Sequence, residues 1–482
     1  MKLTYLGHQG WMISHLNTNV LVDPIFTRSF GTSSALRFHV YPPRRINMAD
    51  MPKISAVVVT NEHLDHFHLI SLQLIPKDIP IIMSDFMPQA SIDILEADGQ
   101  TVLQAKNGEN IEISDIKLRL YLGDESSEFW EKRVCHAYFY TGELAVFIQS
   151  DAMVSHQFKE DIENELCIPP LVFVTTNNSQ IPPQDIRGAF DNVLPLAEDN
   201  INHGPYGIRL LFELLTRYTE GLPYIPYIVL NGGGYVQEPM KHGLFLLGDQ
   251  KILSEQANKL CLGQKIIGPY PGDCLVLNQG IIEIEKSDWI DIDEQKIESI
   301  KKQGAIDSKD VLQKGPIIPL ETHSDSINIL IEEELQIMAK CILLSKLGSF
   351  IIATDEYLDG PVNSNRFIIN LNRVNELPIQ YVLNINKCKF VEIEIPENEM
   401  ITHFPYGIDM YFSDFVALLE GKIHIWELAT ARMNQWYLCS RLESPVAFLY
   451  RYFSEQVRPS IAKKMYHHIA ENRDSLFSYH NQ

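Results

Sequence analysis

The sequence predicts a layered α/β protein, and two patterns in its first half indicate this class. Near the N-terminus, turn residues separate short apolar segments, as in a β-meander; the segments lie at 3–6, 11–14 and 19–22. Further on, β-branched runs such as 56–59 alternate with helically spaced segments such as 68–75. A meander followed by alternating strands and helices predicts sheets that are covered by helices.

The alternation continues along the chain. Further strands are expected at 80–83, 116–121, 144–149, 170–174 and 226–230, and a helix at 207–219. Beyond residue 324, the pattern predicts helices at 327–344, 412–419 and 461–471 and strands at 366–371 and 390–395. This last part is expected to form a smaller α+β unit.

A chain of 482 residues is long enough for two or three domains, each with its own core. Residues near 287–321 are rich in Asp, Glu, Lys and Gln and poor in large apolar side chains. We therefore expect a first domain at 1–285, a linker or surface segment at 286–323 and an accessory α+β domain at 324–482.

The composition is that of an ordinary globular protein, with 45% hydrophobic and 21% charged residues. The net charge of −22 would repel a phosphate backbone, so nucleic acid is not an expected partner. Neither a secretion signal nor an apolar run of about 18 residues is visible, so we expect a cytoplasmic protein without a membrane span. Seven scattered cysteines without a Cys-x-x-Cys pair predict reduced core residues.

Side chains that bind metals are concentrated directly after the strand at 56–59. The loop reads Thr60-Asn61-Glu62-His63-Leu64-Asp65-His66, and imidazole and carboxylate groups are common metal ligands. On an extended loop alternate side chains point the same way. The side chains at positions 61 and 63 therefore converge on one ion, while Asp65 and His66 reach another. The alternative is a chance cluster in a solvated loop. The sequence favours a metal site at His63, Asp65 and His66.

This loop resembles the His-x-His-x-Asp-His signature of the metallo-β-lactamase fold, an αββα sandwich. Three of the four ligands are present, and Asn61 stands where the first histidine is usual, as in a mono-metal subclass of β-lactamases. The resemblance implies that this half of the site binds metal more weakly. The alternative for Asn61 is a turn-forming role, in which its side chain satisfies loop backbone.

Other segments strengthen the resemblance. The opening at 4–11 and 21–24 is similar to the first strands of the lactonase-like branch of the fold. Asp151, after the strand at 144–149, matches the bridging aspartate, although Ser150 replaces the usual glycine. Asp124 and Glu125 stand near the place of a further histidine ligand, which implies a carboxylate ligand; an exposed acidic turn is the alternative.

The family's last histidine usually follows a late strand and a glycine turn. Here Tyr235 follows the turn Gly232-Gly233-Gly234, and because tyrosine is a poor substitute, His242 is the candidate ligand. The glycine run lacks the Lys-Ser/Thr pair of a phosphate-binding loop, so it is expected to be a tight turn beside the site. His203 is a weaker candidate ligand, and His136, inside a strand, is expected to be structural.

Over residues 1–285 the chain resembles the metallo-β-lactamase-like domain of CMP-N-acetylneuraminate hydroxylases. Through Glu125 it is also similar to the di-iron β-hydroxylase of chloramphenicol assembly. The CMP-N-acetylneuraminate hydroxylases also carry a Rieske iron–sulfur domain. Its Cys-x-His and Cys-x-x-His ligand pairs are absent from this sequence. The resemblance implies one or two iron ions, with zinc or manganese as alternatives, and a separate electron-donor protein.

Two classes of enzyme fit these residues. An iron oxygenase or hydroxylase that acts on a small or carrier-linked metabolite is favoured, because carboxylates in place of histidines make an oxygen-rich site. The first alternative is a zinc hydrolase of a lactone, amide or phosphodiester, with Asp65 or Asp151 steering the proton. The second is a non-catalytic binding module, for which Asn61 and Tyr235 are the best arguments.

The sequence does not name the substrate. Arg44, followed by Arg45, lies before the metal-bearing strand and is a candidate for holding an anionic small molecule; exposed surface arginines are the alternative. Tyr235, at the glycine turn, is a second candidate substrate contact. The C-terminal domain carries an aromatic cluster at 404–407 and Trp426. Covering the cleft, homodimerisation and partner binding are the roles open to it.

Overall fold

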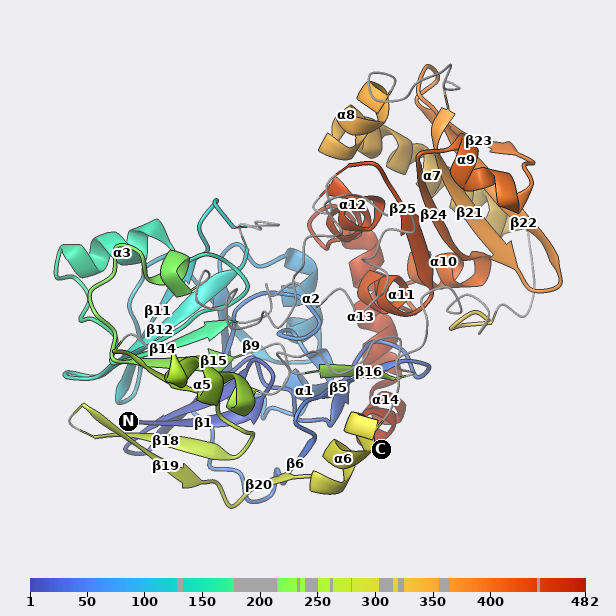
Figure 1. Ribbon diagram of the computed structural model, residues 1–482. Coiled ribbons are helices and arrows are strands. Elements are labelled where there is room, and N and C mark those ends of the chain that lie inside the picture. Colours follow the sequence, from blue (N-terminus) through green and yellow to red (C-terminus); the bar gives the residue numbers. More distant parts are fainter. Residues whose placement is uncertain are drawn as a thin grey trace.

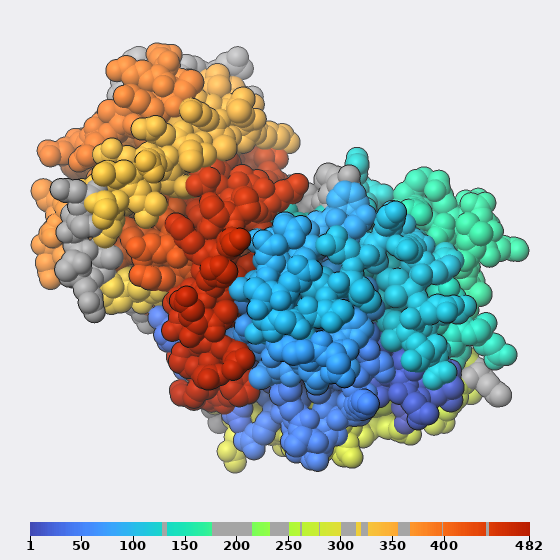
Figure 2. Space-filling view, turned by 180° about the vertical axis from the view of Figure 1, so that it is seen from behind, coloured from blue at the N-terminus to red at the C-terminus, as the bar shows by residue number. Residues whose placement is uncertain are grey.

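The computed structural model describes residues 1–127, 133–176, 215–231, 235–238, 250–260, 263–278, 280–302, 315–319, 325–354, 365–439 and 443–482. Two lobes are visible in Figure 1: a larger one built from the first part of the chain and a smaller one that contains the orange segment. The red C-terminal segment returns from the smaller lobe to the larger one. Figure 2 shows this segment packed along the blue N-terminal part.

The first sheet of the larger lobe has eight strands. In spatial order they are β19 (Ile281–Lys286), β18 (Asp273–Asn278), β1 (Lys2–Gly7), β2 (Gly10–His15), β3 (Thr18–Val22), β7 (Ala56–Val59), β8 (Pro80–Ser84) and β9 (Thr101–Ala105). Strands β1 to β3 form the predicted meander, and β3, β7, β8 and β9 run parallel. Every residue of β7 is buried, which suits its Ala-Val-Val-Val sequence to the interior of the sheet.

The second sheet has seven strands and packs face to face with the first. Its spatial order is β10 (Ile111–Ile113), β11 (Ile116–Leu122), β12 (Cys135–Tyr140), β13 (Ala145–Ile148), β14 (Val172–Thr176), β15 (Tyr227–Asn231) and β17 (Lys265–Ile267). One core joins both sheets, with Trp11 and Val58 from the first and Phe139 and Val146 from the second.

Helices cover the outer faces of both sheets. Helices α1 (Leu69–Leu72) and α2 (Gln89–Ala97) share a core with the first sheet, and α3 (His156–Glu163) and α5 (Gln250–Lys259) share one with the second. The predicted αββα sandwich is therefore present. Small sheets flank it, made of β4 (Ser29–Phe30), β5 (Arg37–Val40) and β16 (Tyr235–Glu238), and of β6 (Arg44–Ile46) and β20 (Ile290–Ile292).

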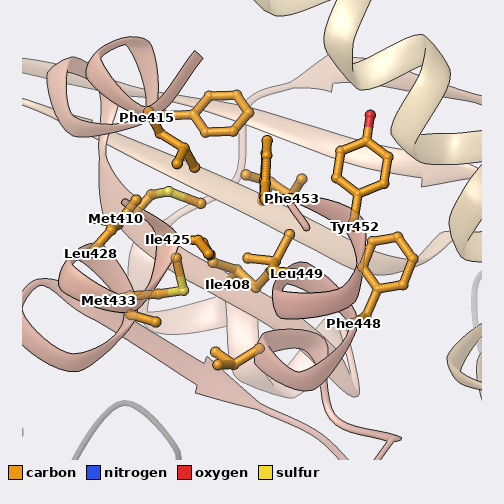
Figure 3. Close-up of a cluster of buried hydrophobic side chains, with 14 of the residues drawn as sticks. Ile408, Met410, Phe415, Ile425, Leu428, Met433, Phe448, Leu449, Tyr452 and Phe453 are labelled. Atoms are coloured by element: carbon orange, nitrogen blue, oxygen red, sulfur yellow. The ribbon is translucent and has the colours of Figure 1, made fainter. Parts of the chain in front are cut away.

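The smaller lobe is built on a five-stranded sheet. Its strands are β23 (Lys389–Ile393), β22 (Glu376–Asn384), β21 (Asn365–Arg373), β24 (Tyr406–Tyr411) and β25 (Met433–Trp436). Its helices are α7 (Asp325–Leu344), α8 (Lys346–Ala353), α9 (Met400–His403), α10 (Phe412–Leu419), α11 (Ile425–Ala431) and α12 (Pro445–Tyr452), with a 3-10 turn η6 (Glu397–Glu399). Figure 3 shows Ile408 and Met410 of β24 packed with Leu428 of α11 and Leu449 of α12.

The last two helices lie against the larger lobe. Helix α13 (Pro459–Glu471) packs on α2, where Met465 and Ile469 share a core with Ile92, and α14 (Arg473–His480) contacts α1. The segment after residue 285 also contacts this lobe, since β20 pairs with β6 before α6 (Glu294–Lys302). The domain boundaries thus remain a prediction. The start of the predicted linker and the end of the predicted accessory domain both contact the larger lobe.

One predicted helix is wrong in length. Within 68–75 only α1 is helical, because the amides of Leu74 and Ile75 bond to carbonyls three residues back and tighten the chain into a turn. Most of the helix predicted at 207–219 lies outside the described residues.

Within the described part of the chain, no single helix is long and apolar enough to cross a membrane. Among the described helices, Ser326–Leu344 and Lys346–Ala353 reach that length and composition only as a pair, across a bend of 77°. The described cysteines are free, and four of them are buried as predicted. Cys341 is half-buried and Cys388 is exposed, so neither is a full core residue.

The smaller lobe depends on a close approach at Gly407. A Cβ atom there would lie 2.0 Å from the ring of Trp436, its cross-strand neighbour. We expect Gly407→Ala to lower the free energy of unfolding by about 1–3 kcal/mol. Gly142→Ala is the control, because its Cβ would meet no atom within 4 Å. Equal denaturation midpoints for both variants would show that Trp436 does not pack on Gly407.

Candidate metal centre

The predicted metal loop joins β7 to α1 as a compact turn. The amides of His66 and Phe67 both donate to the carbonyl of His63, at 2.9 and 2.7 Å. Asn61 Oδ1 accepts from the amide of His63 at 2.9 Å, and its Nδ2 donates to Ser150 Oγ at 3.0 Å. The expected extended loop is therefore wrong, because these bonds fold it. The turn-forming role considered for Asn61 is confirmed.

Four of the predicted ligands converge after β7 and β13. Ligand atoms of His63, Asp65 and Asp151 lie within 4.8 Å of one another, a grouping able to hold one metal ion. His66 extends the group, since its Nε2 lies 2.9 Å from Asp151 Oδ2 and 3.8 Å from Asp65 Oδ2. Because β7 belongs to the first sheet and β13 to the second, the centre joins the two halves of the sandwich.

The carboxylate of Asp23 orients His66 from the side of the ring opposite Asp151. Asp23, directly after β3, places Oδ2 2.7 Å from His66 Nδ1. It also accepts from the amide and hydroxyl of Thr60, at 2.8 and 2.6 Å. A carboxylate on Nδ1 leaves Nε2 facing a metal and makes the imidazole a stronger ligand. From the sequence, Asp23 was placed only in the segment 21–24 that resembles the family, without a role. Its position after a strand that neighbours β7 is the missed signal.

The turn between β1 and β2 holds the two aspartates that are predicted as ligands. His8 Nε2 lies 2.8 Å from Asp65 Oδ2, and both side chains are buried. Gln9 Nε2 donates to Asp151 Oδ1 at 3.3 Å, and Gln9 Oε1 accepts from Asn231 Nδ2. Neither His8 nor Gln9 was predicted to be functional, although both lie in the opening segment on which the family resemblance partly rested.

His136 fixes the loop that carries Asp151. Its Nδ1 accepts from the amide of Ser150 at 3.0 Å, so its Nε2 carries the proton and donates to the carbonyl of Met153 at 3.0 Å. Burial lowers the pKa of His136 to about 4, so it is neutral at neutral pH. The predicted structural role is confirmed.

Three carboxylates surround His66. Burial alone would lower the pKa of His66, but Asp65, Asp151 and Asp23 hold that pKa well above its usual value. Burial alone would raise the pKa of Asp151, but the charges of His66 and His63 hold it well below its usual range. Asp151 therefore stays ionised, and the centre stabilises a positive charge.

The donor set fits a divalent first-row metal. Asp65 Oδ1 is buried and lacks a hydrogen-bond partner among the described residues, so it is available to an ion. Two imidazoles and two carboxylates suit iron, manganese or zinc. Donors that each lie about 2.1 Å from one ion are roughly 3–3.5 Å apart. The separations of His66 Nε2 from the two aspartates, 2.9 and 3.8 Å, are close to this range.

The acidic turn at Asp124 and Glu125 lies near the centre but is not part of the group. The amide of Asp124 bonds to Met153, two residues after Asp151, at 3.0 Å. Its carboxylate accepts from the amide and hydroxyl of Ser126, at 2.9 and 2.7 Å, and Glu125 is exposed. In this structure both residues form the acidic turn considered as the alternative, and their role as ligands remains a prediction.

Arg44 has a structural place. It is 1% exposed, and its guanidinium donates to the carbonyls of Leu6, Thr27 and Ile25, at 2.7, 2.6 and 2.5 Å. These bonds tie the segment after β3 to β1, so the predicted substrate contact does not fit this position. Exposed Arg45 lies next to it on β6.

Several predicted residues can be placed only in part. Tyr235 begins β16, where its backbone pairs with Val40 of β5, and its side chain lies outside the described residues. His242, His203 and the glycine run at 232–234 also lie outside them.

Comparisons with known proteins agree with this architecture. Residues 18–128 match the model of a beta-lactamase superfamily domain. Together with the two-sheet sandwich and the loop after β7, this match identifies the larger lobe as a metallo-β-lactamase fold. None of the curated proteins matches the chain.

Solved structures of low sequence identity are also similar. One is a diiron beta-hydroxylase from Streptomyces venezuelae, with 16% identity over 56% of this chain and 53% of that chain and a TM-score of 0.37. Another is an isothiocyanate hydrolase from Delia radicum gut bacteria, with 16% identity, 58% and 99% coverage and a TM-score of 0.38. The chain spans about half the length of the beta-hydroxylase.

We expect the double variant His63→Ala/His66→Ala to lose bound metal, because it removes both imidazoles of the centre. Mass spectrometry for metals after dialysis gives the metal content per chain. His156→Ala/His403→Ala, which changes two exposed histidines, is the control. Equal metal content in both double variants, or a wild type that stays metal-free after anaerobic loading with iron, manganese or zinc, would contradict the assignment.

Replacing Asp23 by Asn tests the orientation of His66. We expect the affinity for zinc or iron to fall by about 10- to 100-fold, because the neutral amide no longer supports the imidazole. Calorimetric titration should still reach the wild-type stoichiometry. Asp98→Asn, at a surface ion pair with Lys77, serves as the control. An unchanged affinity in Asp23→Asn would mean that His66 does not bind the metal through Nε2.

Proposed function

We propose that the protein is a metal-dependent enzyme and, more narrowly, a non-heme iron oxygenase or hydroxylase that acts on a small or carrier-linked metabolite. The observation that carries this proposal is the convergence of His63, Asp65, His66 and Asp151, with Asp65 Oδ1 buried and available. Two histidines with a carboxylate are the usual protein ligands of iron in oxygenases of this chemistry.

The four residues would hold the metal, which supplies dioxygen activation when it is bound. Asp23 and His8 orient His66 and Asp65 from behind, so the imidazole and the carboxylate keep their direction during turnover. Gln9 donates to Oδ1 of Asp151, which is more exposed than Asp65, and so holds this carboxylate in place. We propose that a separate protein donates the electrons.

A zinc hydrolase of a lactone, amide or phosphodiester is the second candidate. The observation that favours it is the place of Asp124 and Glu125 outside the group, since those carboxylates were an argument for iron. A bound zinc lowers the pKa of its water to about 7, and Asp65 or Asp151 would then receive the proton.

We expect protein loaded anaerobically with ferrous iron to consume dioxygen and to develop a near-ultraviolet absorption band that responds to reductant. The reason is that ferrous iron held by two imidazoles and carboxylates reacts with dioxygen. An oxygen electrode and a spectrophotometer measure both effects, with the His63→Ala/His66→Ala variant as the control. Stoichiometric zinc in the purified protein, together with turnover of lactones or phosphodiesters, would contradict the oxygenase and support the hydrolase.

A further inference from the structure

The smaller lobe reaches the metal centre through the start of α11. The ring of Trp426 lies 5.7 Å from the ring of His63, at an interplanar angle of 40°. Leu64, inside the metal loop, belongs to the core of the smaller lobe. The metal centre therefore has a wall that the larger lobe does not supply.

A buried carboxylate fixes the start of α11. Glu427 is fully buried and accepts from the amide of His424 at 2.9 Å, which closes a capping box on the helix. It also accepts from the amides of Thr32 and Ser33 in the larger lobe, at 2.9 and 3.2 Å. At Gly31 a Cβ atom would lie 2.8 Å from Glu427 Oε1, so a larger residue would disturb this contact. The wall is thus held in place by both lobes.

The hydrogen bond at the helix cap also fixes the tautomer of His424. Its Nδ1 accepts from the amide of Trp426 at 3.1 Å, so the neutral ring carries its proton on Nε2. His424 is half-buried, and its ring lies 6.2 Å from that of Trp426. His424 also lies within electrostatic range of His63 and Asp65, and burial lowers its pKa to about 3. Because Nδ1 is occupied by the cap, Nε2–H is the one donor that the ring offers, next to the indole of Trp426.

We propose that His424 and Trp426 bind the substrate at the metal centre. The Nε2–H group of His424 donates to a substrate oxygen, and the half-buried indole of Trp426 packs against a planar group attached to that oxygen. The substrate class is accordingly a carbonyl or carboxylate compound. Its oxygen accepts the hydrogen bond, and a planar or aromatic group is attached to that oxygen-bearing part. This inference rests on the proposed function, because it requires a metal at His63, Asp65, His66 and Asp151.

The test uses full-length protein loaded with cobalt(II), whose visible absorption reports ligands at the metal, and acetohydroxamate as the probe. His424→Asn keeps a cap acceptor in place of Nδ1, and because the side chain is shorter it leaves no donor at the position of Nε2. We expect acetohydroxamate affinity to fall about tenfold, the size of one hydrogen bond, with cobalt stoichiometry unchanged. His403→Asn, at an exposed histidine of the same lobe, should bind as the wild type does.

A second variant tests the aromatic part. Wild type should prefer benzohydroxamate over acetohydroxamate, and Trp426→Leu should reduce that preference by roughly fivefold. If the wild type binds cobalt but acetohydroxamate binds His424→Asn equally tightly, or does not bind at all, the inference is overturned while the metal centre stands. If the preference is unchanged in Trp426→Leu, the aromatic part is overturned. A wild type that binds no cobalt overturns the proposed function itself.

Discussion

The architecture of the centre depends on the charge balance around His66. This imidazole lies between Asp23 on Nδ1 and Asp151 on Nε2, and Asp65 lies beside it. Asp23 and Asp65 are buried and Asp151 is half-buried, and three carboxylates at such distances repel one another strongly unless a cation lies among them. A proton on His66 supplies that cation in the absence of metal, and a divalent ion supplies a larger positive charge. Three separate strands, β3, β7 and β13, must therefore end at one place, and the sandwich brings them there.

The smaller lobe belongs to the same functional unit. Glu427 joins the start of α11 to Thr32 and Ser33 across the two lobes, and α13 lies on α2 of the larger lobe. A buried carboxylate that accepts several amide hydrogen bonds is costly to separate from its donors, so this contact resists opening. The lobe is accordingly better described as part of the metal centre than as an independent appendage.

Local chemistry could be predicted from the sequence, and long-range neighbours could not. His63, Asp65 and His66 lie in one loop, and Asp151 was found through the family resemblance, so the convergence of these residues could be predicted. Asp23 and His8 were missed because their roles depend on β3 pairing with β7 and on the turn after β1 facing Asp65. Arg44 was misjudged because the three carbonyls that bind its guanidinium converge only in the folded chain, which no local pattern shows. Asp124 was open to a better interpretation, since Ser126 two residues later is a usual partner for an aspartate turn.

The most direct test of the metal centre is X-ray absorption at the metal edge of the iron-loaded protein. We predict a first shell of nitrogen and oxygen donors at about 2.0–2.2 Å, with the multiple-scattering signal of about two imidazoles. That signal should disappear in the His63→Ala/His66→Ala variant. A shell of oxygen donors without imidazole, or the same imidazole signal in the variant, would contradict the assignment of His63 and His66 as ligands.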